Sequence, residues 1–407
     1  MNSQSAANRM AGAKGELATV LVVGPTPPPY QGVSVVTANI LKSDLRNRFR
    51  LVHLEIADRR TLANVGRVDL ANVLMAIQHG MEFLRLLVTE RPRLIHLTVA
   101  ETTLGFLRDS LFLIPARLLR KPVVIHLHGG HFGMFYERSN ILMKGLIRFS
   151  IRRVDRVIVL GEHLRGVVGS LVEPGRVSVV PNGVPEPLCA STENSPIKKG
   201  AGFNVLYMGN LWGAKGFCDL LHAVPLVQER AREEVRFWLV GDDSFPEARK
   251  AQEWVRERKL EHVVRFLGVR VGAEKDAILD AADALVFPSH GPEGQPLVLL
   301  EAMAAGLPII STRLATAVET LGEHGALFVE PRNPGEIAEK LLTLRNDDSL
   351  RRDIIARNRA RFAKFYGLDR FAMNLGEVFA QVLDAQGVGE SSGKGYGKAA
   401  AVPARHS

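Results

Sequence analysis

The sequence predicts an α/β protein made of two doubly wound domains with parallel sheets. Short apolar runs alternate with amphipathic stretches along most of the chain, a rhythm typical of strand–helix units. The alternation stops once, at a Pro-rich and polar segment, and then restarts. A length of 407 residues suits two domains of ordinary size. We divide the chain into a flexible N-terminus (1–16), a first domain (17–190), a linker (191–202), a second domain (203–365), a final helix (366–386) and a disordered tail (387–407).

The first domain is expected to contain five buried strands. Each is a short run rich in Val, Ile and Leu, and amphipathic stretches such as 73–87 and 110–119 separate them. The expected strands are 19–23, 50–55, 94–97, 123–126 and 156–160.

The second domain repeats this pattern after the Pro-rich segment 181–187 and the polar linker. A long helical stretch of mixed charge, 333–384, follows its strands, and the chain ends in a segment of low complexity. The expected strands are 204–207, 235–240, 263–266, 284–287, 309–311 and 326–329.

Composition narrows the class of protein. A hydrophobic content of 46% with 23% charged residues is typical of a globular chain. Cys189 and Cys218 provide neither a disulfide framework nor a metal-binding spacing, which favours a reducing compartment. We find no signal peptide and no apolar run of the roughly 18 residues that a spanning helix needs. A cytoplasmic location is therefore expected.

The net charge of +9 lies in the first half of the chain. Residues 1–190 carry 24 Lys and Arg against 14 Asp and Glu, a balance of +10, and residues 191–407 have a balance of −1. Such an excess suits nucleic acid, an anionic membrane surface or a phosphorylated substrate. Nucleic acid is disfavoured, because aromatic residues make up 6% of the chain and do not interleave with the basic residues.

The segment from Lys144 to Arg156 is the most basic amphipathic stretch. Lys144, Arg148 and Arg152 are four residues apart and would share one face of a helix, with apolar residues on the others. Two readings stay open: a surface that rests on an anionic membrane, or the solvated face of an ordinary packed helix.

The most informative segment is 287–310, which contains two glutamates eight positions apart. Glu293 lies in a Gly- and Pro-rich loop after a predicted strand, and Glu301 lies in an apolar helical stretch that ends at Gly306. A strand, loop and helix of this kind place ligands at the carboxyl edge of a parallel sheet. Two carboxylates there suit a ligand with paired hydroxyls, such as a sugar or a ribose.

Two segments of the first domain are candidate ligand contacts. The turn before Gly32 would expose backbone N–H groups at the start of a helix, which suits an anion, although a purely structural turn fits equally. His128 and Gly129 follow a predicted strand. A ligand contact and a satisfied core histidine are both compatible with that position.

In the second domain, Asn210, Lys215 and Gly216 follow the first predicted strand. A Gly turn and then a lysine at the opening of a helix could hold a diphosphate, because the lysine supplies charge and the helix supplies N–H donors. The alternative is a solvated lysine. The segment lacks the GxxxxGK[ST] pattern of a P-loop.

With these motifs in view, the chain resembles the retaining GT-B glycosyltransferases of family 4 over roughly residues 18–385. The glutamate–seven–glutamate motif carries the resemblance, with its flanks Pro288-Ser289, Gly294 and Gly306-Leu-Pro308. The segments at Gly32, His128-Gly129, 181–183 and Lys215-Gly216 fall in the family's order. The resemblance implies two Rossmann-like domains facing a cleft, with the last helix crossing back to the first domain.

The resemblance also implies roles. Catalytic residues would be His128, Glu293 and Lys215, which contact the sugar and stabilise the leaving diphosphate. Glu301 would hold the ribose hydroxyls of a nucleotide-sugar, and no metal or other cofactor is expected. The remaining donor contacts would be Gly32, Gly129, Asn210, Gly294, Gln295, Pro296 and Leu297.

Two positions depart from the family pattern. Asn210 stands where the family usually has an arginine, and an amide cannot replace its charge. Gln31 stands where the family often has a glycine. The expected activity is transfer of a hexose-type sugar to a saccharide or lipid-linked acceptor in surface polysaccharide synthesis, at the inner face of the membrane. A sugar-nucleotide epimerase and a non-catalytic nucleotide-sugar-binding protein remain as alternatives.

Overall fold

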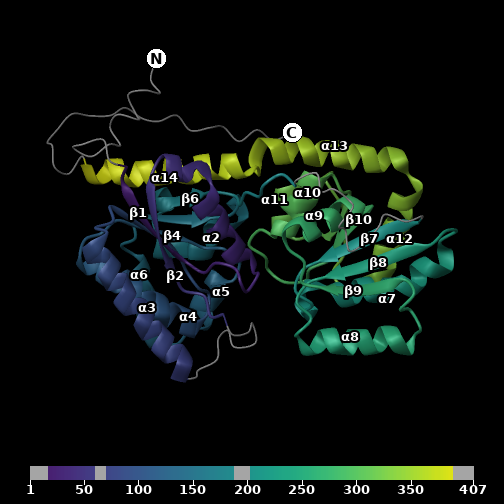
Figure 1. The fold of residues 1–407 in the computed structure, drawn as a ribbon, viewed down its shortest axis with the longest axis horizontal. Helices are drawn as coiled ribbons and strands as arrows, with labels where there is room; N and C mark the ends of the chain where they lie inside the picture. The colour runs from purple at the N-terminus through teal and green to yellow at the C-terminus, as the bar shows by residue number, and fades with distance from the viewer. Residues whose placement is uncertain (1–16, 60–69, 188–201, 388–407) are drawn as a thin grey trace, which may run out of the picture.

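The computed structural model describes residues 17–59, 70–187 and 202–387, and it contains two parallel six-stranded sheets, one in each half of the chain (Figure 1). The predicted fold class, with two Rossmann-like domains, is confirmed. The expected N-terminal segment 1–16, nearly all of the linker 191–202, Cys189 and the tail after 387 lie outside the described residues.

The first sheet has the order β2-β1-β3-β4-β5-β6. Its central strands are buried on both faces, because helices cover both sides, and this explains their continuous runs of Val, Ile and Leu. The strands are β1 (Thr19–Gly24), β2 (Arg50–Glu55), β3 (Leu94–Thr98), β4 (Val123–His126), β5 (Arg156–Val159) and β6 (Val177–Val179). The helices are α2 (Gly32–Lys42), α3 (Leu70–Thr89), α4 (Thr103–Leu118), α5 (Phe132–Arg138) and α6 (Ile141–Ile151).

The second sheet has the order β12-β11-β10-β7-β8-β9 and a single large core. Its strands are β7 (Phe203–Met208), β8 (Val235–Val240), β9 (Val264–Gly268), β10 (Ala284–Phe287), β11 (Ile309–Thr312) and β12 (Leu327–Val329). Its helices are α7 (Phe217–Arg230), α8 (Pro246–Glu257), α9 (Gly272–Ala281), α10 (Leu297–Ala305), α11 (Ala315–Leu321) and α12 (Pro334–Asn346).

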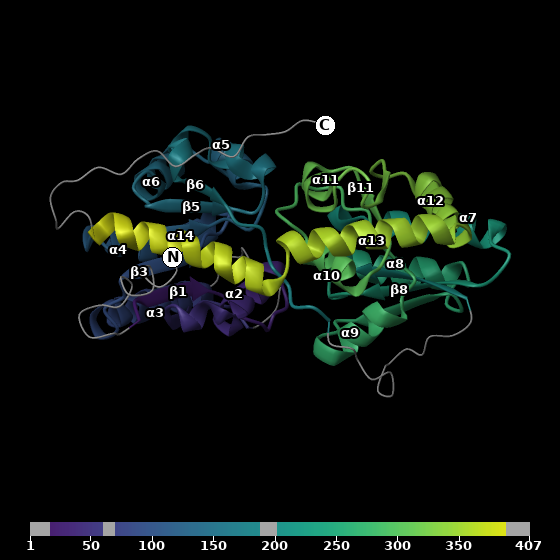
Figure 2. The same cartoon turned by 90° about the horizontal axis from the view of Figure 1, so that it is seen from above.

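Two long helices close the fold from one side. In Figure 2, α13 (Asp348–Phe365) lies over the second domain and α14 (Leu368–Gly387) lies over the first. Phe379 of α14 packs edge-to-face on Phe49 with ring centroids 5.8 Å apart. The chain thus returns to the first domain, and α14 completes the core on one face of its sheet.

Three details differ from the sequence predictions. Strand β6 was not predicted, because three residues are too short for a period to show. The stretch 333–384 forms three helices, and the break that was not predicted lies at Asp347, whose side chain caps the start of α13. The expected basic helix ends at Ile151, so Arg152 is its C-cap residue and Arg156 begins β5.

Candidate functional site

The loops after β4 and β10 meet between the two domains. A Cβ atom built on Gly294 would lie 1.9 Å from the carbonyl oxygen of His128, and one on Gly130 would lie 2.9 Å from the carbonyl oxygen of Glu293. Both loops leave the carboxyl ends of their strands, where parallel sheets bind ligands. The structure therefore brings the predicted segments 128–129 and 293–297 into contact.

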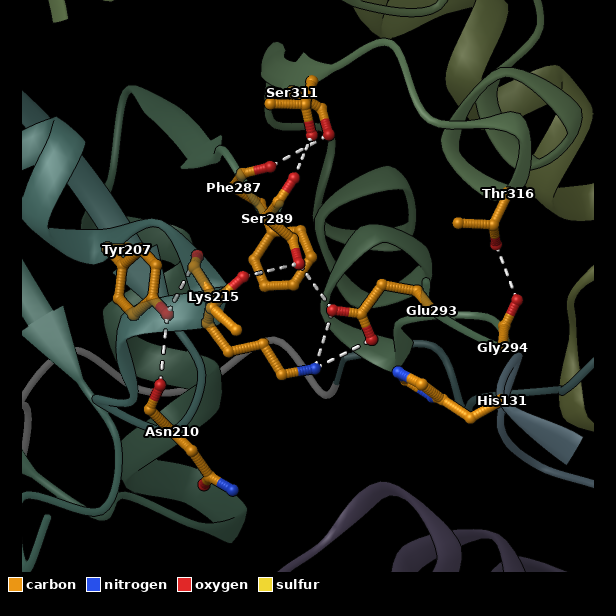
Figure 3. A network of polar contacts seen from close by, with 12 residues as sticks. His131, Tyr207, Asn210, Lys215, Phe287, Ser289, Glu293, Gly294, Ser311 and Thr316 are labelled. Atoms are coloured by element: carbon orange, nitrogen blue, oxygen red, sulfur yellow. Dashed lines mark hydrogen bonds and ion pairs between the residues drawn. The ribbon is translucent and has the colours of Figure 1, made fainter. Parts of the chain in front are cut away.

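Glu293 is held at this junction by two partners from its own domain (Figure 3). The Lys215 ammonium lies 2.7 Å from each carboxylate oxygen, and the Ser289 hydroxyl donates to Oε1 at 2.6 Å. Figure 3 also shows the ring of His131, from the first domain, directed toward this carboxylate. Two predicted catalytic residues, Lys215 and Glu293, are thus direct neighbours.

Lys215 lies immediately before a helix N-terminus. Residues Gly213–Lys215 form a 3-10 turn, and Gly216 in the left-handed conformation (φ 76°) starts the 14-residue helix α7. A Cβ on Gly216 would lie 1.9 Å from the Pro288 carbonyl oxygen, so the turn requires glycine. The ammonium and the free N–H groups of α7 form a cradle suited to phosphate oxygens.

Asn210 does not join the Lys215–Glu293 pair. Its backbone carbonyl accepts a hydrogen bond from the Tyr207 hydroxyl at 3.2 Å, and Figure 3 shows its side-chain amide directed away from Glu293. Tyr207 also donates to the Lys215 carbonyl at 3.4 Å. The loop is therefore tied to the core through Tyr207, and Lys215 is the cation that it presents beside Glu293.

Glu301 lies on α10 in a separate ion pair. Its carboxylate is 2.8 Å from the Lys275 ammonium of α9, and the side chains are 14% and 26% exposed. Although burial disfavours a charged lysine, the adjacent carboxylate raises the pKa of Lys275. Glu301 is thereby kept as an acceptor with a fixed orientation. Lys275 was not predicted, because 26 residues separate it from Glu301.

The backbone between the glutamates is fixed by second-domain and first-domain groups. The Thr316 hydroxyl donates to the Gly294 carbonyl at 2.6 Å, and the backbone N–H of Asn182 donates to the side-chain oxygen of Gln295 at 2.7 Å. Pro296 is the N-cap of α10, and Leu297 packs against the cores of both domains. The N–H groups at the start of α10 are consequently held at the domain boundary.

His128 belongs to a row of three neutral imidazoles. The His126 and His128 ring centroids are 4.0 Å apart, and His96 Nε2 lies 3.2 Å from His126 Nδ1. Burial lowers the pKa of His128 to about 3 and that of His96 to about 4. At neutral pH, His128 can therefore offer a hydrogen bond but no positive charge.

Glu101, which contacts the loop after β4, is a site residue that the sequence did not reveal. Its carboxylate accepts the N–H of His131 at 2.9 Å, and Gly129 also donates its amide to it. A Cβ on Gly129 would overlap this carboxylate at 2.3 Å, which explains the glycine. Burial raises the pKa of Glu101 to about 7, against the effect of the two amides. The sequence held one signal for Glu101: it lies just after the predicted strand 94–97. Because β3 and β4 are neighbours in the sheet, the residues after these two strands lie close together.

Gly32 occupies the first position of α2, and open space surrounds the place where its Cβ would be. Gln31 closes a capping box with Ser34, whose hydroxyl accepts the Gln31 amide at 3.0 Å. The departure at Gln31 is thus compatible with a regular helix start. The structure places Gly32 at the carboxyl end of β1, on the same sheet edge as His128.

A second contact between the domains lies beside the site. Glu319 of α11 accepts the backbone amides of Glu162 and His163 at 2.6 and 3.0 Å, and its carboxylate also pairs with the His163 ring. Burial alone would raise the pKa of Glu319, but these hydrogen bonds lower it. We call this contact the Glu319 clasp.

Within the described residues, no group of three or more His, Cys, Asp or Glu side chains is arranged to hold a metal ion. Among the helices of 17–59, 70–187 and 202–387, none is long and apolar enough to cross a bilayer.

Two Rossmann-like domains whose loops meet at the carboxyl edges of their sheets define a two-domain α/β class of protein, and comparison with known proteins identifies the family. The model for Glycosyltransferase Family 4 matches residues 19–186, and that for Glycosyl transferases group 1 matches residues 202–347. The chain belongs to the group 1, family 4 glycosyltransferases and has the GT-B fold.

Relatives and solved structures agree with this placement. N-acetyl-alpha-D-glucosaminyl L-malate synthase of Bacillus anthracis is 25% identical over 272 residues, covering 65% of this chain and 69% of the relative. Phosphatidyl-myo-inositol mannosyltransferase of Mycobacterium leprae is 33% identical over 183 residues, covering 44% and 46%. The Anabaena protein HepE in complex with UDP and glucose superposes with a TM-score of 0.71 at 18% identity, covering 89% of this chain and 100% of that one.

Proposed function

We propose that the protein is a retaining glycosyltransferase that moves a hexose-type sugar from a nucleotide-sugar to an acceptor hydroxyl. The observation that carries the proposal is the contact of Lys215 with both oxygens of Glu293, beside the N-terminus of α7 and at the junction of the domains. One cation for the diphosphate and one carboxylate for the sugar are thus held side by side, where both can face the same sugar–phosphate bond.

The reaction breaks the bond between the sugar's anomeric carbon and a diphosphate oxygen, which leaves with the electron pair. Lys215 and the free N–H groups of α7 stabilise the charge that develops on the diphosphate. The acceptor oxygen forms the new bond on the same face, and its proton passes to the leaving phosphate. We expect these groups to stabilise the leaving diphosphate without a metal ion.

Binding of the donor is divided between the two glutamates. Glu301, oriented by Lys275, accepts hydrogen bonds from the ribose hydroxyls. Glu293 and the backbone from Gly294 to Leu297 hold the transferred sugar. HepE, which shares the fold, was solved with UDP and glucose, and this supports a nucleotide-sugar donor.

The first domain supplies the opposite wall. Gly32 lets the β1–α2 loop approach the phosphates, and His128, being neutral, hydrogen-bonds a sugar hydroxyl without adding a charge. Gly129 and Glu101 set the position of that loop. Asn210 leaves Lys215 as the loop's cation, so we expect the donor to be held more loosely than by an arginine–lysine pair.

We further propose a lipid-linked saccharide as the acceptor, used in surface polysaccharide synthesis at the cytoplasmic face of a membrane. The excess of basic residues lies in the first domain, and the basic residues from Lys144 to Arg156 belong to it. The M. leprae relative is named for a mannosyl transfer to phosphatidyl-myo-inositol, which supports a lipid acceptor.

The experiment begins with a thermal-shift screen of nucleotide-sugars, since a ligand of the native state raises the Tm. With the donor found, release of nucleotide is measured for wild type, Lys215→Ala and Glu301→Ala. Lys215→Ala should lose about 10²–10³ in kcat, the effect of removing one transition-state donor. Lys250→Ala, an exposed lysine of α8, is the matched control and should keep full activity.

Full turnover by Lys215→Ala or Glu301→Ala would sink the assignment. Incubation with the donor alone separates the alternatives. An epimerase would release an epimerised nucleotide-sugar or sugar without any acceptor, whereas a binding protein would shift the Tm and leave the donor intact.

A further inference from the structure

The solvent-facing side of α3 carries an apolar stripe along its whole length, with Gln78 and Arg85 exposed beside it. The inner side packs into the core through Phe83, Leu86 and Leu87. The outer residues recur every three or four positions, so they form one stripe. This stripe consists of Leu70, Val73, Leu74, Ile77, Met81, Leu84 and Val88, which are 46–76% exposed.

The apolar surface continues onto the two neighbouring helices. Helix α3 packs on α4, and α4 packs on α6. The Leu111 side chain of α4 lies within van der Waals reach of a Cβ placed on Gly80 of α3, at 3.7 Å. We call this surface the α3–α4–α6 face. Its other exposed apolar residues are Leu107, Leu111, Leu118 and Leu119 on or just after α4, and Ile141, Leu142 and Phe149 on α6.

Such a surface is unusual for a chain of ordinary composition. Single exposed apolar side chains are common, but a contiguous patch over three helices marks a site of interaction. The opposite face of the same sheet offers a contrast, because α14 covers it and buries Phe371, Leu375 and Phe379 there. The α3–α4–α6 face has no such cover among the described residues (Figure 1).

Basic side chains border the α3–α4–α6 face. The Arg117 guanidinium lies 3.8 Å from the Phe149 ring centroid, and Lys144 and Arg148 lie 5.6 Å from the ring of Tyr136. Arg120 and the residues after α6, Arg152 and Arg153, are exposed. Cations placed beside exposed apolar and aromatic groups match the boundary between headgroups and acyl chains of an anionic bilayer.

Acidic residues offset only a small part of this positive charge. Glu82 is paired with Arg85 at 2.6 Å, and Asp109 is buried and paired with Arg108 at 2.8 Å. Glu137 lies 3.7 Å from Lys144 and is itself exposed. The border of the face therefore carries a net positive charge.

We propose that the α3–α4–α6 face docks the protein on an anionic bilayer, with the α3 stripe entering the apolar boundary and the basic border contacting headgroups. This inference deepens the proposed function, because it names the surface that would bring the enzyme to a lipid-linked acceptor. It extends the docking element well beyond the basic stretch recognised in the sequence.

The orientation suits delivery of such an acceptor. Helix α3 follows β2 and α6 follows β4, so the N-termini of both lie toward the carboxyl edge of the sheet, where His128 and Gly129 stand. Leu70, Ile141 and Leu142 occupy these ends and are 76%, 84% and 81% exposed. The most exposed apolar residues would then contact the bilayer on the side of the carboxyl edge of the sheet.

Two other occupants fit less well. A second copy of the chain could pair along α3, because the stripe follows a heptad-like spacing. The apolar surface extends over three helices, however, and the charges beside the stripe, Glu82 and Arg85, pair with each other within α3. The chain's own termini are also poorly suited. The segments 1–16 and 388–407 contain as large apolar residues only Met1, Met10, Val388, Tyr396 and Val402.

The test is flotation of the full chain with phosphatidylcholine vesicles that contain or lack phosphatidylglycerol. The variant is Leu74→Gln, Ile77→Gln, Met81→Gln, because glutamine keeps the helix propensity of α3. We expect wild type to bind the anionic vesicles and the triple variant to lose at least about tenfold in partitioning. The matched control is Val269→Gln, Val271→Gln, two exposed apolar residues of the second domain, which should bind like wild type.

The charge contribution is measured separately with Arg148→Gln, Arg152→Gln. A loss of about 30-fold is expected, from about fivefold for each basic residue at an anionic surface. Far-UV circular dichroism and Tm confirm that each variant is folded. Docking on the membrane and glycosyl transfer can fail separately, because flotation needs no donor and nucleotide release needs no vesicle.

Three results would overturn the proposal: equal binding of wild type to neutral and anionic vesicles, no binding to either, or unchanged binding by the triple variant. Light scattering measures the oligomeric state and so tests whether a second copy of the chain covers the α3–α4–α6 face. A wild-type dimer that the triple variant converts to a monomer would assign the face to self-association instead.

Discussion

The contact between Gly294 and His128 allows a quantitative test of how closely the two domains must approach. A Cβ on Gly294 would stand 1.9 Å from the His128 carbonyl oxygen, whereas real Cβ atoms do not come within 3.0 Å of other atoms. The Gly294→Ala variant must therefore separate the two loops by at least about 1 Å. A displacement of that size near reacting groups typically costs about 10²-fold in rate.

We expect Gly294→Ala to lower kcat/KM about 100-fold while the free energy of unfolding falls by about 1–3 kcal/mol, the usual cost of overpacking. The domains can relieve the overlap by opening, so the fold should survive. The assay compares nucleotide release and thermal unfolding with Gly291→Ala, a glycine of the same loop whose Cβ would meet no atom within 4 Å. Wild-type kinetics in Gly294→Ala, or equal losses in both variants, would refute the reasoning.

Three further predictions concern residues that the tertiary structure revealed. Lys275→Met leaves the Glu301 carboxylate unpaired and should lower the free energy of unfolding by about 2 kcal/mol, less than the ~3–5 kcal/mol of fully buried pairs. It should also raise the KM for the donor. An unchanged Tm together with an unchanged KM would contradict the assigned role of Lys275. Glu101 has a folded pKa of about 7, above its ordinary value, so its ionisation should destabilise the fold as pH rises from about 4.5 to 7. Unfolding titrations should show this fall in wild type, about 3 kcal/mol at most, and a flatter profile in Glu101→Gln; parallel profiles would exclude it. Glu319→Gln should loosen the clasp to His163, and small-angle scattering would detect this as an increased radius of gyration. Because the pKa of Glu319 is lowered, wild type should lose the clasp's stabilisation only as pH falls below the ordinary carboxyl range. Identical scattering of wild type and variant at neutral pH would count against a clasp.

The glutamate motif shows how far local sequence reaches into the site. A Gly-rich loop placed Glu293, a run of helix formers placed Glu301, and Gly306 does end α10 in the left-handed conformation. The turn from Lys215 to the start of α7 was equally readable, because glycine and a following helix are local signals. The arrangement of each side chain on its own element was therefore predictable.

The partners of these residues were not readable in the same way. Lys275 pairs with Glu301, and Glu319 reaches Glu162 and His163 across 157 and 156 positions. Nothing in the neighbouring sequence distinguishes these charged residues from the many that face solvent. The apolar stripe of α3 is a similar case. The sequence predicted an amphipathic helix there, but only the packing of α3 on the sheet shows that apolar side chains also face solvent.

The sequence alone thus specifies the alternation of strands and helices, the two-domain α/β class and the loops that carry Lys215, Glu293 and Glu301, because each depends on residues close together in the chain. Tertiary structure adds that Lys215 and Glu293 are paired at 2.7 Å and that Glu101 holds the loop at Gly129. It also shows that α14 covers one face of the first sheet, whereas no described helix or strand covers the α3–α4–α6 face. These features depend on how the two sheets and the returning helix are packed. Contacts between distant segments form only when that packing brings them together, and no local pattern encodes them.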